Sequence, residues 1–508
     1  MSIRPPLHLY TAAQSRAVDQ RAMEAEGVSG PVLMARAARA AFGLLMAKRG
    51  LLLAQGAQAE LLQILCGPGN NGGDGLLLAM LAKGRGIPTR VLLLDGIPRS
   101  IDGAAAAARA QSAGVLLEDF APDKLAGHGV IVDAMLGTGI SGEVRPAYRT
   151  AIEKINTLQL PVFALDVPSG IDSDTGAVSQ GVSKGVRAAA VRASWTLSFI
   201  TAKRGLYTAA GGEYAGECFY DDLEVPAAAF AAAGAAYQVL RLEDQLQKLP
   251  VRLAGAHKGH FGRCLLVGGD HGMGGAIMLA TEAALRSGVG LVRVATRQAH
   301  LGPLLARRPE AMVSAVDHRN ALMPLLAWAD AVVVGPGLGQ DVWGEQMLHA
   351  CLASGKPLLL DADALNLLAV QGGRPLPAGS VITPHPGEAA RLLPQESQPV
   401  QNDRFGTAEE LARAWHTVVV LKGNGSLVVG PTLRGLCVDG NPGMASGGMG
   451  DVLSGLLGGL LAQGVGAEDA AALAVVLHAK AGDKAAARIG ERGLLASDLM
   501  PFIAELSG

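Results

Sequence analysis

The sequence predicts two large α/β domains, each with helices packed on a mostly parallel sheet. The chain has 508 residues, and a domain usually takes about 100 to 200. Short apolar runs alternate with helix-like stretches in both halves, which is typical of strands buried on both faces of a parallel sheet. Glycine accounts for 68 residues, above a usual share of about 7%. Aromatic residues make up only 4%, which favours α/β layers over an aromatic-cored β-sandwich.

Composition excludes several classes of protein. The 43 basic and 45 acidic residues give a net charge of −2, whereas a nucleic-acid-binding protein normally shows a basic excess. The five cysteines have no CxxC spacing, which argues against a zinc site or a disulfide framework. The longest uncharged stretches, Val225–Leu240 and Val452–Ala467, fall short of the about 20 apolar residues of a membrane span. Met1–Tyr10 lacks the apolar segment of a signal peptide. We therefore expect a cytoplasmic protein with no membrane or nucleic-acid partner.

The elements of the first half follow from this pattern in chain order. Two helical stretches come first. Thr11–Gly27 has apolar residues at helical spacing, and Val32–Leu53 follows a Ser-Gly-Pro start. Strands and helices then alternate. The pattern predicts a strand at Leu61–Cys66, a helix at Gly73–Gly84, a strand at Thr89–Leu94, a helix at Asp102–Ala113, and strands at Val130–Val132, Pro161–Leu165 and Ser194–Phe199.

The alanine-rich, uncharged stretch Pro226–Ala236 interrupts the rhythm. We interpret it as a domain boundary, with residues 1–225 before a linker at 226–240 and a second domain at 241–508; a surface helix is the alternative. The alternation then restarts. Strands are predicted at Arg263–Val267, Leu291–Ala295, Ala331–Val334, Pro357–Leu360, Ser380–Ile382, Thr417–Leu421 and Leu427–Val429, and helices at Gly275–Ser287, Ser446–Gln463 and Ala467–Ile489.

The most distinctive motif of the first half is Cys66–Gly75, which follows a strand and opens a helix. Its glycines allow a ligand to approach the backbone, and a helix N-terminus offers free N–H groups to phosphate. The motif is neither GxGxxG nor a P-loop, and a turn capped by Asn and Asp is the alternative. The polar groups that add oxygen acceptors are those of Asn70, Asn71 and Asp74.

Two further loops follow predicted strands, Val132–Gly142 and Leu165–Gly176. Each places an aspartate, Asp133 or Asp166, at the carboxyl end of its strand. A lone aspartate there is often a helix cap, but ligands of open α/β sheets bind at this edge. Three such loops predict one shared crevice.

These motifs resemble the signature loops of the NAD(P)H-hydrate epimerase family over about residues 8–225, including Asp19, Gly27 and Leu33–Met34 of the N-terminal helices. The resemblance implies a Rossmann-like α/β/α sandwich that interconverts the R and S forms of nicotinamide cofactor hydrated at ring carbon 6, with a potassium ion near the substrate phosphates. Oxygen donors suit such a hard cation. Asp166 is the candidate that gives and takes the proton. The implied potassium ligands are Asn71, Asp133 and Ser169, and the implied substrate contacts are Asn70, Asn71, Gly72, Gly73, Asp74, Gly137, Thr138, Gly139, Ile140, Ser141, Gly142, Glu143 and Asp166.

The second half carries a glycine-rich turn, Asn441–Gly455, that runs into a long apolar helix. Its backbone N–H groups suit an anion hole for a transferring phosphoryl group, and Asp451 is placed to accept a proton from an attacking hydroxyl; an N-capping role is the alternative. Lys422–Ser426 is a second phosphate-loop candidate or a plain hairpin turn. His385, between two prolines after a strand, is either a ligand contact or structural.

Gly447–Asp451 resembles the anion-hole motif of the ribokinase-like superfamily. Six ordered motifs narrow the resemblance to ADP-dependent NAD(P)H-hydrate dehydratase over about residues 241–505; they are Lys258–Gly262, Val267–Gly269, Gly335–Gly339, Asp361–Asn366, Thr383–Glu388 and Lys422–Ser426. The resemblance implies dehydration of the S hydrate with ADP, giving AMP and phosphate, with Mg²⁺ shielding the phosphoryl group. It places nucleotide contacts at Lys422, Gly423, Asn424, Gly425, Ser426 and Gly450, hydrate contacts at Ala276, Gly339, His385 and Asp451, and the base at Asp451.

The combined expectation is a bifunctional enzyme for hydrated nicotinamide cofactors, acting on NADH hydrate and NADPH hydrate with ADP. In this enzyme, the first domain would equilibrate the two epimers and the second would dehydrate the S form. The resemblance also suggests a homo-oligomer. Two alternatives stay open: a ribokinase-like kinase of a vitamin or alcohol, and a first domain that only binds its ligand.

Overall fold

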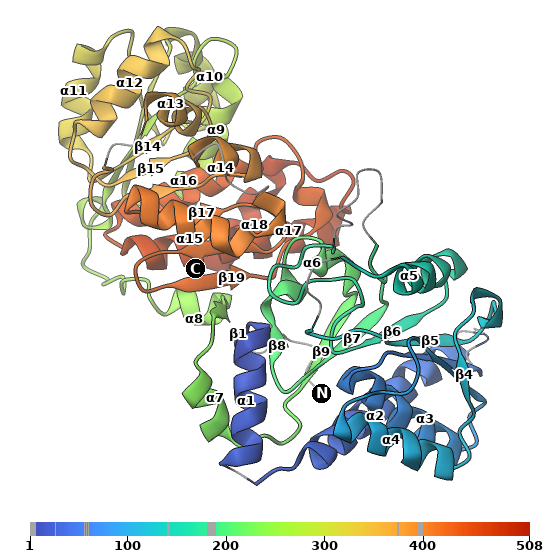
Figure 1. The fold of residues 1–508 in the computed structure, drawn as a ribbon. Coiled ribbons are helices and arrows are strands. Elements are labelled where there is room, and N and C mark those ends of the chain that lie inside the picture. Colours follow the sequence, from blue (N-terminus) through green and yellow to red (C-terminus); the bar gives the residue numbers. More distant parts are fainter. Residues whose placement is uncertain are drawn as a thin grey trace. The chain divides into compact units, whose positions relative to one another are not determined.

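The computed structural model describes residues 7–25, 27–54, 56, 58, 60–139, 143–179, 189–372, 375–393 and 400–507. Contacts divide the chain into two compact units, Met1–Val239 and Leu240–Gly508. Each unit is an α/β fold with its own hydrophobic core (Figure 1).

Unit 1 is built on a parallel sheet with β2 (Leu62–Cys66) near its centre. The chain runs outward from β2 through β3 and β4, and returns to the other side of β2 with β5, so the strand order reverses between β2 and β5. The strands, in spatial order, are β4 (Leu117–Asp119), β3 (Thr89–Leu93), β2, β5 (Val130–Ala134), β6 (Val162–Leu165), β7 (Trp195–Phe199) and β9 (Glu217–Asp221).

Side-chain alternation along these strands produces three layers. Ile64 and Val132 point into one core, which α2 (Gly30–Ala54), α3 (Asn70–Gly84) and α4 (Ile101–Ser112) cover. Leu65 and Ile131 point into a second core on the opposite face, with residues of α5 (Pro146–Leu158). A period of two along strands buried on both faces explains the uninterrupted apolar runs of the sequence.

The remaining elements of unit 1 surround this sandwich. They are β1 (His8–Tyr10), α1 (Ala12–Glu24), β8 (Ala202–Lys203), α6 (Gly211–Tyr214), α7 (Ala227–Ala233) and β10 (Tyr237–Val239). Strand β1 pairs with both β8 and β10. The stretch 226–240 thus contains a helix, which contacts α1, and a strand.

Helix α2 is, within the described ranges, the one helix long and apolar enough to cross a membrane by length and composition. The sequence predicts a helix at Val32–Leu53 and no membrane span. Leu33, Ala37, Ala41, Leu44 and Leu45 of α2 lie in the same core as α3. This packing is that of a helix covering a sheet.

Unit 2 repeats the reversal of strand order. Its chain runs from β11 (Arg263–Val267) outward through β12 and β13 and returns beside β11 with β14. The pairing is parallel as far as β17, and β17, β18 and β19 are antiparallel. The order is β13 (Met312–Ala315), β12 (Leu291–Thr296), β11, β14 (Ala331–Val334), β15 (Leu358–Leu360), β16 (Val381–Ile382), β17 (Val418–Leu421), β18 (Ser426–Val429) and β19 (Arg434–Cys437).

One face of this sheet packs against the apolar helices α9 (Gly274–Arg286), α16 (Met449–Ala462) and α17 (Ala467–Ile489) in the largest core cluster. Helices α11 (Arg319–Trp328) and α12 (Val342–Leu352) contact strands of the same sheet. The other helices are α8 (Leu242–Leu246), α10 (Leu301–Arg307), α13 (Asp363–Gln371), α14 (Pro386–Leu392), α15 (Arg404–Trp415) and α18 (Met500–Ser507).

The predicted fold class is confirmed as α/β: unit 1 is a three-layer α/β/α sandwich, and unit 2 packs helices against a mostly parallel sheet. Boundaries differ at the glycine-rich turns. Helix α3 begins at Asn70 rather than Gly73. Helix α16 begins at Met449 rather than Ser446, because Gly448 has a left-handed φ of 88° that ends the preceding turn.

Candidate active sites

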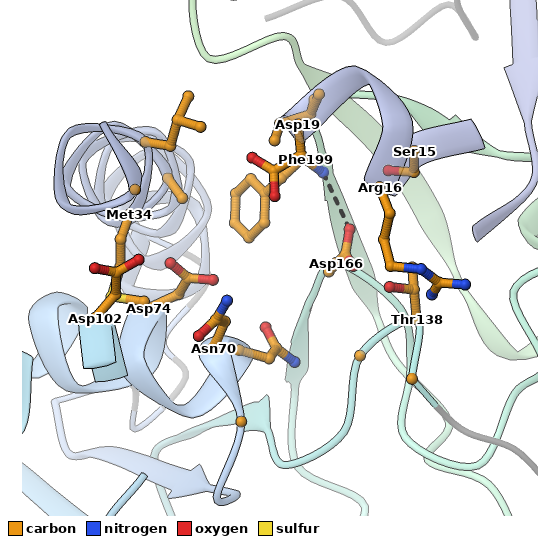
Figure 2. A pocket seen from close by; sticks show the side chains of 18 of the residues that line it. Ser15, Arg16, Asp19, Met34, Asn70, Asp74, Asp102, Thr138, Asp166 and Phe199 are labelled. Carbon is orange, nitrogen blue, oxygen red and sulfur yellow. Dashed lines mark hydrogen bonds between the residues drawn. The ribbon is translucent and has the colours of Figure 1, made fainter. Parts of the chain in front are cut away.

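In unit 1, a cavity of about 550 Å³ lies at the carboxyl edge of the sheet. The loops after β2 and β5 both line it, through Asn70, Asn71 and Gly137–Gly139. These two loops flank the point where strand order reverses, which is where open α/β sheets bind ligands. Figure 2 shows Asn70, Asp74, Thr138 and Asp166 around this cavity. The three loops singled out from the sequence therefore meet in one crevice.

The glycines of the first loop serve two different purposes. A Cβ at Gly67 would collide with the Met135 carbonyl, and one at Gly72 with the Gly67 carbonyl. Gly69, in contrast, has open space around it and lines the cavity. It precedes α3 without any side-chain cap, so the first N–H groups of α3 are available to an anion. Gly67 and Gly72 thus shape the loop, and Gly69 leaves room for a ligand.

Asp166, just after β6, has an unusual backbone conformation and forms a close ion pair with Lys203. Its φ is 64°, in the left-handed region that a non-glycine residue seldom adopts. The Lys203 ammonium lies 2.5 Å from Asp166 Oδ1 and also donates to the Phe199 carbonyl at 2.7 Å. The Lys203 side chain is only 2% exposed, and that of Asp166 15%. Both residues line the cavity.

Further carboxylates gather around this pair. Asp19 comes from α1, Asp74 from α3 and Asp102 from α4. Burial raises the pKa of Asp74 well above its usual value, and the charges of Asp166 and Asp19 raise it further, against a lowering by Lys203. Burial likewise raises the pKa of Asp19. Like charges that share a poorly hydrated cleft favour a protonated carboxyl beside an ionised one.

A buried network connects the loops after β5 and β6. Asp133, fully buried, accepts hydrogen bonds from the Ser169 hydroxyl at 2.6 Å, from the Ser169 N–H at 2.7 Å and from the Met135 N–H at 3.2 Å. Burial raises the pKa of Asp133 to about 6, while the hydrogen bonds from Ser169 and Met135 lower it. The Ser169 hydroxyl in turn accepts from the Leu136 N–H at 2.9 Å.

Asn71 lies beside this network with one unsatisfied atom. Its amide nitrogen donates to the carbonyls of Leu136, at 2.9 Å, and Leu165, at 3.1 Å, which fixes the orientation of the amide. Its Oδ1 atom is buried with no hydrogen-bond partner among the described residues. A buried, unpartnered carbonyl oxygen costs free energy unless a ligand completes it.

The other predicted residues of unit 1 differ in position. Gly72 and Gly73 are buried in the helix start. Glu143 lies 3.9 Å from Arg149 in an ion pair. Ile140, Ser141 and Gly142 lie outside the described residues.

In unit 2, the loops on either side of the strand-order reversal also meet. The Asp270 N–H, after β11, donates to the Gly337 carbonyl after β14 at 2.6 Å. A Cβ at Gly337 would approach the Ala276 side chain at 3.2 Å. The Gly339 N–H donates to Asp363 Oδ2 at 3.0 Å. Ala276 and Gly339, two predicted contact residues, therefore border the same edge of the sheet.

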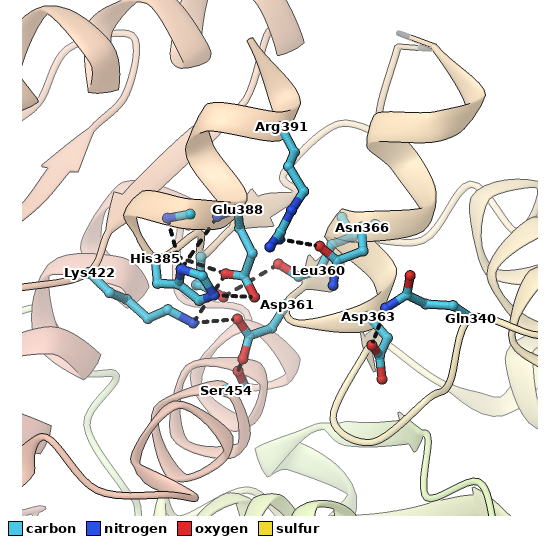
Figure 3. A network of polar contacts seen from close by, with 12 residues as sticks. Gln340, Leu360, Asp361, Asp363, Asn366, His385, Glu388, Arg391, Lys422 and Ser454 are labelled. Carbon is cyan, nitrogen blue, oxygen red and sulfur yellow. Dashed lines mark hydrogen bonds and ion pairs between the residues drawn. The ribbon is translucent and has the colours of Figure 1, made fainter. Parts of the chain in front are cut away.

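Lys422, after β17, is the centre of a network of acids (Figure 3). Its ammonium lies 2.6 Å from Asp361 Oδ1 and 3.8 Å from Glu388 Oε2. Asp361 Oδ2 accepts from the Ser454 hydroxyl of α16 at 2.7 Å. Burial lowers the pKa of Lys422, but Asp361 and Glu388 outweigh it and raise the pKa overall. His385 caps α14, with its Nε2 atom 3.3 Å from Glu388 Oε1.

The glycine-rich turn before α16 approaches this network. A Cβ at Gly450 would lie 3.4 Å from the Lys422 ammonium, so the backbone and the cation are in close range. The pKa of Asp451 is raised to about 7, chiefly by burial and also by the charge of Asp361, against a lowering by Lys422. The structure thus brings together Lys422, Gly450, Asp451 and His385 of the predicted set.

Two buried cations were missed in the sequence. Lys203 follows β7 by only a few residues, and a polar residue after a strand end was its one local signal. Arg404 is 1% exposed and donates to the carbonyls of Leu421 at 3.2 Å, Lys422 at 3.3 Å and Gly425 at 3.2 Å. Arg404 therefore holds the loop between β17 and β18 from beneath, and no local pattern marks it.

Two family models match the chain. Residues 30–205 match the YjeF-related protein N-terminus, and residues 264–505 match NAD(P)H-hydrate dehydratase. The first match contains most of the residues that line the cavity of unit 1, though not those of α1, and the second contains the Lys422 network.

Full-length relatives match across both units. The chain is 44% identical to a bifunctional NAD(P)H-hydrate repair enzyme of Coxiella burnetii, covering 97% of this chain and 98% of the relative. It is 40% identical to the enzyme of the same name from Escherichia coli, covering 97% and 93%. A solved structure of ADP/ATP-dependent NAD(P)H-hydrate dehydratase from Bacillus subtilis is 30% identical, with a TM-score of 0.48, and covers 53% of this chain and 96% of that one.

Proposed function

Since the chain belongs to the family of bifunctional NAD(P)H-hydrate repair enzymes, we propose that it restores hydrated nicotinamide cofactors by two reactions. Unit 1 interconverts the R and S hydrates, and unit 2 dehydrates the S form with ADP, releasing AMP and phosphate. NADH hydrate and NADPH hydrate are the substrates. The proposal assigns epimerisation to residues 1–225 and dehydration to residues 241–508, joined by 226–240, in a cytoplasmic homo-oligomer.

Epimerisation requires a bond at ring carbon 6 to break and reform on the opposite face. Loss of the hydroxyl as water takes up one proton, and return of water releases one, so one group that gives and takes a proton balances the reaction. We assign this role to Asp166, which lines the cavity. The Lys203 ammonium, at 2.5 Å, compensates its charge and fixes its direction. Asp74, whose pKa burial raises, supplies a protonated carboxyl that can donate to the substrate.

The donor set beside this cavity suits potassium. The unpartnered Oδ1 atom of Asn71 and the buried oxygens of Asp133 and Ser169 are the oxygen ligands that such a cation takes. These three residues would hold K⁺, which would supply a positive charge next to the substrate phosphates. Asn71 and the first turn of α3 then share the binding of the anionic part of the substrate.

In unit 2, dehydration proceeds by transfer of the β-phosphoryl group of ADP to the ring hydroxyl, followed by elimination of phosphate. Asp451 accepts the hydroxyl proton as the new O–P bond forms and AMP departs. The C–O bond then breaks with its electron pair on phosphate, and the proton on the ring carbon next to carbon 6 passes to solvent, which restores the dihydropyridine. The backbone N–H groups at Gly448–Gly450 stabilise the transferring group. Lys422–Ser426 hold the nucleotide phosphates, and Ala276, Gly339 and His385 contact the hydrate.

Mg²⁺ normally binds through one or two carboxylates together with substrate phosphates. In the part of the chain that the structure describes, no group of three or more His, Cys, Asp or Glu side chains could hold a metal ion alone. The carboxylates of Asp361 and Glu388 next to Lys422 fit such a shared site. Mg²⁺ would neutralise charge on the transferring phosphoryl group.

One observation supports the proposal above all: the chain has both candidate sites, the cavity of unit 1 and the Lys422 network of unit 2, and it matches a bifunctional relative over nearly its full length. The test is recovery of NADH absorbance from a mixed-epimer hydrate preparation on addition of ADP. Full recovery supports both reactions, and recovery of the S portion alone removes the epimerase. No recovery with ADP, together with ATP-dependent phosphorylation of an unrelated alcohol, would instead establish a small-molecule kinase.

A further inference from the structure

The loop that leads into α16 contacts helix α17 at several points along its length. This loop, Asp439–Gly448, contains a 3₁₀ turn at Pro442–Met444 and ends at the left-handed Gly448. Asp451 lies in the first turn of the helix that follows. The position of Asp451 and of the Gly448–Gly450 amides therefore depends on how this loop is fixed.

Asp483 of α17 anchors the start of the loop with both carboxylate oxygens. Its Oδ2 atom accepts from the Gly440 N–H at 3.0 Å, and its Oδ1 atom accepts from the Asn441 amide at 3.0 Å. Charged acceptors make hydrogen bonds stronger than neutral ones. Lys480 adds a contact nearby, with its ammonium 2.5 Å from Asp439 Oδ1.

In the middle of the loop, Met444 packs against Gly482 of α17, where the lack of a side chain makes room for it. A Cβ there would lie 2.9 Å from Met444 Cε and 3.0 Å from Met444 Cγ, closer than real carbon contacts. Met444 therefore lies directly on the helix backbone. An alanine there would force the Met444 side chain to move away from the helix.

His478, one turn earlier on α17, reaches the end of the loop. It is 9% exposed and interacts with the Met449 backbone. Burial lowers the pKa of His478 to about 4, so the ring is neutral near pH 7. His478 and Gly482 are four residues apart and share one face of α17, and Asp483 follows Gly482 directly; together these three residues form the loop-facing surface of α17.

We propose that this surface positions the anion-hole turn and Asp451, with Asp483 as the principal positioning residue. The inference rests on the proposed dehydratase reaction. Asp483 acts through Gly440 and Asn441 rather than on the substrate. Its loss should therefore slow the chemical step more than it weakens ADP binding, because all the proposed nucleotide contacts except Gly450, namely Lys422–Ser426, belong to a different loop.

The test compares Asp483→Ala with Asp469→Ala in the full-length protein. Asp469 lies on the same helix in an exposed ion pair with Lys248. Three quantities are measured: kcat for dehydration, the Kd of ADP alone by calorimetry, and hydrogen exchange of the amides from Gly440 to Asp451. We expect Asp483→Ala to lower kcat about tenfold or more, to change the ADP Kd by less than about twofold and to speed exchange in the loop. Asp469→Ala should match the wild type.

Asp483→Asn guards against a folding defect. Its side chain keeps the volume but replaces one acceptor by a donor, so we expect an intermediate loss of kcat at an unchanged Tm. Unchanged kcat and exchange in both variants overturn the positioning role. A parallel fall of Tm, ADP affinity and kcat also overturns it, in favour of general destabilisation. A wild-type protein without turnover defeats the proposed function, whereas loop exchange in Asp483→Ala still decides the positioning role.

Discussion

Lys203 and Asp166 form a buried ion pair at the wall of the unit 1 cavity, with 2.5 Å between the ammonium and Oδ1. Water has little access to the ammonium group, because the Lys203 side chain is 2% exposed. Removing one member of such a pair leaves an uncompensated charge. The ion pair therefore contributes both to the stability of this part of unit 1 and to the proposed proton transfer by Asp166.

Lys203→Met should lower epimerase kcat by about 100-fold or more, since general acid–base catalysis contributes about 10² to 10⁴. Dehydration of purified S hydrate should stay unchanged. The measurement is the initial rate of R hydrate loss, with epimers separated by chromatography. Lys83→Met, at an exposed position of α3, is the matched control. An epimerase rate within twofold of wild type would remove Lys203 from the mechanism.

Asp451→Asn should have the reverse effect. The amide cannot accept the hydroxyl proton, so we expect dehydratase kcat to fall by about 10² to 10⁴ while epimerisation continues. NADH recovery from S hydrate and ADP provides the measurement. Substantial turnover by this variant would show that another group is the base.

The pH profile offers an independent test of Asp451. Burial raises its pKa to about 7, and only the carboxylate can act as a base. Dehydratase kcat/KM should therefore be full above the pKa and fall about tenfold per pH unit below it. In Asp451→Asn, any residual activity should lose this limb. A profile in the wild type that stays flat through pH 7 contradicts the assignment.

Potassium should stabilise unit 1 and activate it. A ligand that binds only the folded state at about 100 times its Kd contributes about 2.7 kcal/mol. We expect KCl, compared with choline chloride at equal ionic strength, to raise both the epimerase rate and the temperature at which that activity is lost. Asn71→Leu, which removes the unpartnered oxygen, should abolish both responses. Equal behaviour in the two salts would exclude the cation site.

Arg404→Met should loosen the nucleotide loop. The carbonyls of Leu421, Lys422 and Gly425 lose a buried donor, at a cost of about 1–3 kcal/mol for unsatisfied groups. We expect a KM for ADP raised about tenfold and a lower free energy of unfolding in urea. Arg413→Met, at an exposed position of the same helix, should change neither. If ADP affinity stays at the wild-type value, Arg404 serves stability alone.

Much of the unit 1 site can be predicted from the sequence, because its polar residues lie at or just after the ends of predicted strands. Asn70, Asp133 and Asp166 stand at the carboxyl ends of apolar runs, and the rule that parallel strands end at one edge brings them together. No knowledge of the strand order is needed for that step. The cavity itself, and its lining by Asp19 and Asp102 from helices, depends on the order.

Other features lie beyond local reasoning. Nothing in the residues next to Lys203 or Arg404 distinguishes a buried cation from a solvated one, because burial arises from elements distant in the chain. Gly67 and Gly72 also appear as ligand-facing glycines in the sequence, whereas their close neighbours are backbone carbonyls. Only the three-dimensional structure distinguishes a glycine that leaves room for a ligand from one that packs against another backbone segment.

The division into two compact units within one chain has a consequence for the cell. Two enzymes on separate chains vary in their relative amounts with transcription, translation and turnover, but two units of one chain are always made in equal numbers. Their relative throughput is then set by the rate constants written into each site, and expression can scale the pathway only as a whole. Adjusting the balance between the two steps requires a change of residues, not a change of dosage.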